Sequence, residues 1–131
     1  MLYILFFISI FSNPLTESDL SDMSSVEKSI QEAIKNGDAK VLASYFYSTV
    51  ELNLPDAKGS FSKSQAELLL KNFFNVHKPK DFSVIKEGTS SGEKSKFAVG
   101  SYADTDGKKF RVYYLIKEIS GNNYISVIKF E

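Results

Sequence analysis

Residues 82–130 read FSVIKEGTSSGEKSKFAVGSYADTDGKKFRVYYLIKEISGNNYISVIKF, and this stretch decides the fold. Its apolar residues largely alternate with polar ones, which is the period of side chains on the two faces of a strand. Three clusters of turn residues interrupt the alternation, at 90–92, 105–107 and 120–123. Clusters of this kind join antiparallel neighbours. The stretch therefore predicts four antiparallel strands, at about 82–88, 93–104, 108–119 and 123–130.

Gly100 lies inside the second of these strands, where a glycine is typical of a bulge or a bend. A long antiparallel sheet that bends in mid-strand curls around whatever packs on its concave side. In the third strand, alternate residues from Phe110 to Ile116 form one apolar face, while Tyr113 and Leu115 lie on the other. An apolar outer face predicts that something also covers that side of the sheet.

Two helical patterns come near the start of the chain. Ser24 and Glu27 have the spacing of a capping box, so the folded domain is expected to begin there. The apolar stripe that follows ends at Asn36-Gly37, where the glycine suits a left-handed helix cap. Asp38 can cap a second short helix. The apolar stripe of that second helix would comprise Val41, Leu42, Tyr45 and Phe46.

A short hairpin and a third helix come next. Residues 50–54 and 60–62 predict two short strands joined by a turn. Ser62 or Ser64 can cap the third helix, and Pro79 prevents that helix from continuing. The third helix would cover one face of the sheet with Ala66, Leu69, Leu70, Phe73 and Phe74.

Composition bounds the class of protein. The chain has 131 residues, 43% of them hydrophobic, which is typical of one globular domain. Sixteen basic and sixteen acidic residues cancel, so nothing favours nucleic acid as a partner. There is no cysteine, and one histidine leaves only carboxylates as plausible metal ligands. Phosphate-binding and dinucleotide-binding glycine patterns are also missing, so we expect neither a metal nor a cofactor.

The first residues allow three interpretations. Leu2 to Phe11 is an apolar run of the length of a signal-peptide core and is too short to span a bilayer. The run could instead be a first strand, or translation could begin at Met23. We expect a signal peptide and a polar, acidic linker over residues 1–23, followed by one domain at 24–131. The protein would then be exported, periplasmic or secreted, and cytoplasmic if Met23 is the start.

The order helix, helix, hairpin, helix and four strands resembles the nuclear transport factor 2-like fold, a cone of curved sheet around three helices. More closely, residues 59–66, Phe73-Phe74 and residues 107–112 resemble a small family of exported bacterial proteins that is catalogued as a domain of unknown function. The resemblance covers about residues 25–131. It implies an α+β fold with three N-terminal helices packed in a curved, mostly antiparallel sheet, a cystatin-like roll. It transfers no catalytic residue.

Aromatic residues on converging stripes suggest a cone-shaped cavity for a small, largely apolar ligand. The same residues could simply fill the core. The residues expected to line the cavity are Tyr45, Phe46, Phe61, Phe73, Phe97 and Val112. On the outer face, Tyr102, Tyr113 and Leu115 are expected to form a homodimer surface.

His77 is the one histidine, and it lies at the end of the third helix. A general base needs an orienting carboxylate, and Asp81 is near in sequence, but helix-end histidines commonly have no catalytic role. Buried carboxylates are not evident, because the aspartates fall in predicted turns. We therefore expect a non-catalytic binding or accessory domain. The alternatives are a small cofactor-free lyase or isomerase that uses the cone, and a structural homodimer module.

Overall fold

The computed structural model describes residues 14–89 and 94–131. Within these residues, three helices and six strands follow one another in an α+β arrangement. In chain order they are α1 (Pro14–Asn36), α2 (Ala39–Ser44), β1 (Phe46–Leu54), β2 (Ala57–Ser62), α3 (Lys63–Val76), β3 (Pro79–Thr89), β4 (Ser95–Asp104), β5 (Lys109–Ile119) and β6 (Asn122–Phe130).

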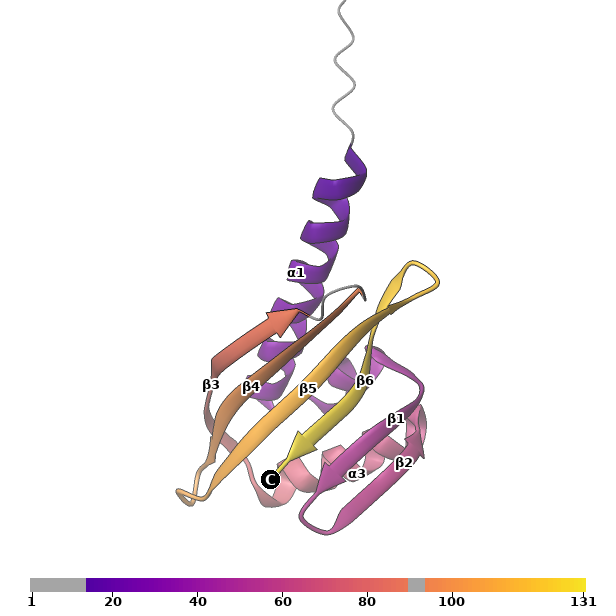
Figure 1. Cartoon of the computed structure of the whole chain (residues 1–131). Coiled ribbons are helices and arrows are strands. Elements are labelled where there is room, and N and C mark those ends of the chain that lie inside the picture. The colour runs from indigo at the N-terminus through magenta and orange to yellow at the C-terminus, as the bar shows by residue number, and fades with distance from the viewer. Residues whose placement is uncertain (1–13, 90–93) are drawn as a thin grey trace, which may run out of the picture.

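The six strands form one sheet in the order β2-β1-β6-β5-β4-β3. The four C-terminal strands are the antiparallel meander that the alternation predicts, while β1 pairs with β6 in parallel. The helices lie together on one side of the curved sheet (Figure 1). One expectation is wrong: the third helix is not N-terminal to the sheet, because the β1–β2 hairpin precedes it and joins the same sheet.

The first helix begins earlier than expected. α1 starts at Pro14, so Ser24 and Glu27 lie inside a continuous helix and do not form its N-terminal cap. The polar segment expected to be a linker is helical from residue 14 onward. Residues 1–13, which include the apolar run, lie outside the described part of the chain, and the signal peptide stays a prediction.

The second helix is shorter than its apolar stripe suggests. α2 ends at Ser44, with Tyr45 as its C-terminal cap, and Phe46 is the first residue of β1. The reason is a competing partner, since the backbone N–H of Ile125 in β6 donates to the Tyr45 carbonyl at 2.7 Å. Val41 accordingly lies exposed, whereas Leu42 is buried.

Three of the other predicted caps are confirmed. The Asp38 carboxylate accepts the N–H of Val41 at 3.0 Å, and the Ser62 hydroxyl accepts the N–H of Gln65 at 3.3 Å. Gly37 has a φ of 65°, the left-handed conformation that favours glycine at a helix end. Local sequence therefore sets three helix boundaries, two through a capping side chain and one through the backbone freedom of glycine.

The irregularity expected at Gly100 occurs on the neighbouring strand. The pairing of β4 with β5 is unbroken, whereas the register of β3 shifts twice, between Pro79 and Asp81 and again at Ile85, an extra residue between Val84 and Lys86. Gly100 faces Val84 at that bulge and leaves room for the ring of Phe82.

We expect Gly100→Ala to lower the free energy of unfolding by about 1–3 kcal/mol, the usual cost of overpacking. The new Cβ would lie 2.6 Å from Phe82 Cε1 and 2.8 Å from the Ser83 carbonyl oxygen, and a backbone atom cannot turn aside. Urea denaturation measures the change. Ser101→Ala, next along the strand, is the control and should change stability by no more than about 0.5 kcal/mol. Equal effects of the two substitutions would contradict the prediction.

Candidate functional site

The concave side of the sheet is filled by aromatic side chains of the protein itself. Phe73 of α3 is 5% exposed and lies at the centre of this cluster. Its ring centroid is 4.8 Å from that of Phe130, 5.2 Å from Phe110 and 5.9 Å from Tyr102. Phe73 is therefore a core residue, although it also reaches the wall of a recess of about 200 Å³ beside His77.

The six residues expected to line a cavity lie in different places. Phe46, Phe73 and Val112 are buried in the core, and Phe61 packs half-buried against it. Tyr45 is half-buried and lines a recess that is described below. The placement of Phe97 in the cone is wrong, because Phe97 pairs with Leu115 on the outer face of the sheet.

The expected dimer surface is only partly on the outer face. Tyr102 is fully buried on the inner face, so its assignment to an outer surface is wrong. Tyr113 and Leu115 do lie half-buried on the outer face, and Phe97 stacks on Tyr113 with ring centroids 6.3 Å apart. Homodimerisation through this face stays a prediction.

One ion pair interrupts the apolar inner face. Lys96 of β4 places its Nζ 2.5 Å from Oε1 of Glu27 in α1, and 3.8 Å from Oε2 of Glu87 in β3. Glu27 is buried, and this burial raises the pKa of its carboxyl. The hydrogen bond to Glu27 in turn raises the pKa of Lys96. Glu27 is thus a buried carboxylate, and the sequence alone does not indicate it as a site residue.

A tyrosine and an amide extend this ion-pair cluster. Gln31 lies one turn after Glu27 on α1, and its Nε2 donates to the Tyr114 hydroxyl at 3.2 Å. Burial raises the pKa of Tyr114 to about 12. The hydroxyl therefore keeps its proton near neutral pH and can donate a hydrogen bond. We refer to Glu27, Gln31, Glu87, Lys96 and Tyr114 as the ion-pair cluster.

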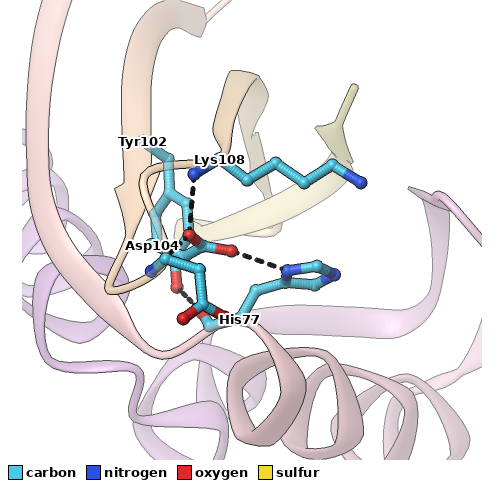
Figure 2. Close-up of polar contacts among 5 residues, drawn as sticks. His77, Tyr102, Asp104 and Lys108 are labelled. Atoms are coloured by element: carbon cyan, nitrogen blue, oxygen red, sulfur yellow. Dashed lines mark hydrogen bonds and ion pairs between the residues drawn. The ribbon is translucent and has the colours of Figure 1, made fainter.

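His77 connects the end of α3 to the β4–β5 turn (Figure 2). Its Nδ1 lies 2.8 Å from Oδ2 of Asp104, and the Tyr102 hydroxyl donates to the His77 carbonyl. Oδ1 of Asp104 accepts the backbone N–H groups of Asp106 and Lys108 at 2.9 and 2.8 Å. The carboxylate that orients His77 is thus Asp104 and not Asp81. Most hydrogen bonds of the Asp104 carboxylate go to the backbone of the β4–β5 turn and stabilise that turn.

This arrangement predicts an acid-sensitive contribution to stability. The hydrogen bond from His77 is the largest cause that lowers the pKa of Asp104. A carboxyl whose pKa is lower in the folded state stabilises the fold above its unfolded value of about 3.9, and this contribution is lost as the pH falls through the folded value. The stability difference between the native protein and Asp104→Asn should therefore shrink between about pH 5 and pH 2.

Urea denaturation at several pH values measures this difference. Asp106→Asn, in the same turn but exposed, is the matched control and should leave the pH profile nearly unchanged. A difference for Asp104→Asn that stays constant down to about pH 2 would show that the carboxylate does not act through its charge.

A second feature of interest is a recess of about 430 Å³ near the β5–β6 turn. Ser25 and Val26 of α1, Ser44 and Tyr45 at the end of α2, and residues 121–124 line it, and we call it the turn pocket. Ser120 and Gly121 both have positive φ, 52° and 84°, which makes the turn tight. Oδ1 of Asn123 is buried and has no hydrogen-bond partner. The sequence predicts only a turn at residues 120–123.

Two kinds of feature are absent from the described residues. No helix in residues 14–89 and 94–131 is long and apolar enough to cross a membrane. In the same residues, no group of three or more His, Cys, Asp or Glu side chains could hold a metal ion.

The fold, with helices against a curved six-strand sheet, is similar to that of solved nuclear transport factor 2-like proteins. A nuclear transport factor 2-like protein of unknown function from Shewanella baltica is similar at 14% identity and a TM-score of 0.61, covering 88% of this chain and 94% of its own. The family model described as domain of unknown function DUF4783 matches residues 27–131. The chain belongs to the DUF4783 family.

Solved structures of this family are also similar to the chain. A DUF4783 family protein from Bacteroides ovatus has 26% identity and a TM-score of 0.71, with 78% of this chain and 90% of that chain covered. One from Bacteroides uniformis has 24% identity and a TM-score of 0.72, with 79% and 94% covered. No curated protein matches the chain significantly.

Proposed function

We propose that this domain is a non-catalytic binding domain that holds a small ligand in the turn pocket. One observation carries the proposal: Oδ1 of Asn123, a residue in the wall of the pocket, is buried without a partner. The volume of about 430 Å³ lies in the range of roughly 300–1,000 Å³ that is common for small-molecule sites.

An unpaired acceptor favours binding for an energetic reason. A buried carbonyl without a hydrogen bond costs about 1–3 kcal/mol. Oδ1 is turned away from solvent, but the last torsion of an asparagine side chain is soft, so a small rotation can bring the oxygen to a ligand. A ligand that donates a hydrogen bond would recover part of the cost.

The turn pocket replaces the apolar cone as the proposed site. Three of the residues expected to line that cone are buried in the core, as described above. Tyr45 is the member of the expected set that lines the turn pocket. The proposed ligand is accordingly a polar molecule with some apolar surface, and not a largely apolar one.

A fragment screen by ¹H–¹⁵N NMR on the whole labelled chain tests the proposal. A bound fragment should shift the side-chain amide signals of Asn123 and the backbone signal of Gly121. Asn123→Ala should weaken the binding of such a fragment about tenfold, which corresponds to about 1.4 kcal/mol. Asn75→Ala, on the exposed side of α3, is the control and should leave binding unchanged. No shift of any pocket signal across the screen would refute the proposal.

A second candidate function is a small lyase or isomerase, and the ion-pair cluster favours it. Chemistry of this kind needs a titratable group inside the cone and a hydrogen-bond donor beside it. Glu27 would act as the base, and the Tyr114 hydroxyl would donate to a substrate carbonyl. The short contact between Glu27 and Lys96 opposes this role, because it occupies the carboxylate.

Deuterium exchange tests the catalytic alternative. A panel of small ketones in D₂O should gain deuterium next to the carbonyl with the native protein but not with Glu27→Gln. Exchange at the uncatalysed rate for every compound would eliminate this candidate.

A further inference from the structure

We infer that the turn pocket takes a neutral, hydroxyl-bearing ligand of the saccharide class. This inference rests on the proposed function, since it names the ligand of the same pocket. Three properties of the lining residues carry it: their lack of charge, their two aromatic rings and their short polar side chains.

Charge is the first property. No residue that lines the turn pocket has an acidic or basic side chain, apart from the weakly acidic hydroxyls of the two tyrosines. Glu27 follows Val26 along α1, but its carboxylate is paired with Lys96 on the inner face of the sheet. A charged ligand would lose hydration here without gaining an opposite charge, which is costly. A neutral ligand avoids this loss.

The two tyrosines are the second property. Tyr45 and Tyr124 are both half-buried in the pocket wall. An edge contact with Tyr47 fixes the ring of Tyr124, with the centroids 5.3 Å apart and the planes at 70°. Tyrosine combines a rigid apolar ring with a hydroxyl, so it can contact the C–H surface and the polar edge of one molecule. A sugar ring presents both kinds of surface.

Short polar side chains are the third property. The pocket wall includes the side chains of Ser25, Ser44, Asn122 and Asn123. Serine and asparagine side chains donate and accept, and this suits ligands with several hydroxyl groups. The unpaired Oδ1 of Asn123 needs a donor, which a sugar hydroxyl supplies without bringing a charge. An ammonium group would also donate, but it would lack an anionic partner in this pocket.

NMR titrations with matched sugars test the inference on the whole labelled chain. The neutral probes are glucose and N-acetylglucosamine, and the charged ones are glucosamine and glucuronate. The neutral sugars should shift the side-chain amide signals of Asn123, and the charged sugars should bind at least tenfold more weakly. Asn123→Ala should reduce the binding of the neutral sugars about tenfold.

Two variants keep the test decisive. Asn123→Asp places a carboxylate at the same position, and it should reverse the preference in favour of glucosamine. Asn75→Ala should bind all four sugars like the native protein. The NMR spectrum of each variant shows whether it is folded, and an unfolded Asp variant leaves the comparison of the four sugars on the native protein to decide.

The possible outcomes separate this inference from the proposed function. Equal binding of neutral and charged sugars, or binding of the charged ones alone, would overturn the inference. Binding of other fragments at the turn pocket with no sugar binding would overturn the saccharide class and leave the proposed function in place. If neither sugars nor fragments shift any pocket signal, both fail.

Discussion

Phe73→Ala is expected to lower the free energy of unfolding by about 3–5 kcal/mol, the range for removing a buried phenylalanine ring. The ring is 5% exposed and contacts the aromatic rings of Phe110, Phe130 and Tyr102. Its removal leaves a cavity that these rings cannot easily close, because they come from different strands of one sheet. Urea denaturation followed by circular dichroism measures the loss.

Leu68→Ala is the matched control for this prediction. Leu68 lies on the same helix but is 59% exposed, so its removal should cost no more than about 0.5 kcal/mol. A similarly small cost for Phe73→Ala would mean that the ring lines an open space and does not fill the core. That result would restore the apolar cavity that the aromatic stripes suggest.

Lys96→Met is expected to lower the free energy of unfolding by about 2–4 kcal/mol. Removing one partner of a fully buried ion pair costs roughly 3–5 kcal/mol, because it leaves the other charge buried and unpaired. The expected loss is smaller here because the Lys96 side chain is 24% exposed, whereas Glu27 is buried. The combined substitution Glu27→Gln with Lys96→Met should cost less than Lys96→Met alone, since no buried charge is then unpaired and Glu87, which also loses its partner, is 49% exposed.

The chain offers a matched control for the ion pair as well. Lys94 pairs with Glu118 at 3.4 Å, and its side chain is 71% exposed. Lys94→Met should therefore cost about 0–1 kcal/mol, the usual value for an ion pair at the surface. If Lys96→Met cost no more than Lys94→Met, water would be screening the Glu27 pair, and the buried character of the ion-pair cluster would be refuted.

The sequence predicted the features that depend on neighbouring residues. The alternation from Phe82 to Phe130 placed the four strands, because side chains of a strand alternate between two faces whatever the rest of the fold does. Asp38 and Ser62 marked the starts of two helices through hydrogen bonds that span three residues. The Ser24–Glu27 spacing failed as a cap because the same four residues also fit inside a longer helix.

Alternation could not say which face of each strand points inward. Aromatic residues occur on both faces of β4, Phe97 on one and Tyr102 on the other, so the sequence pattern is symmetrical. The register decides, because Tyr102 lies opposite Phe110 of β5, whose side chain is in the core, and Phe97 lies opposite Leu115. Register depends on the pairing of whole strands, so single residues could not reveal it.

By itself the sequence determined the class of fold, the strands, three of the caps and the family resemblance, all of which rest on local periodicity and short motifs. Only the tertiary structure decided the candidate sites. Glu27 meets Lys96 because α1 packs across the strands, and the turn pocket joins segments from α1, α2 and β6 that are far apart along the chain. Contacts between distant segments leave no periodic signal in one sequence, which is why both sites had to be found in three dimensions.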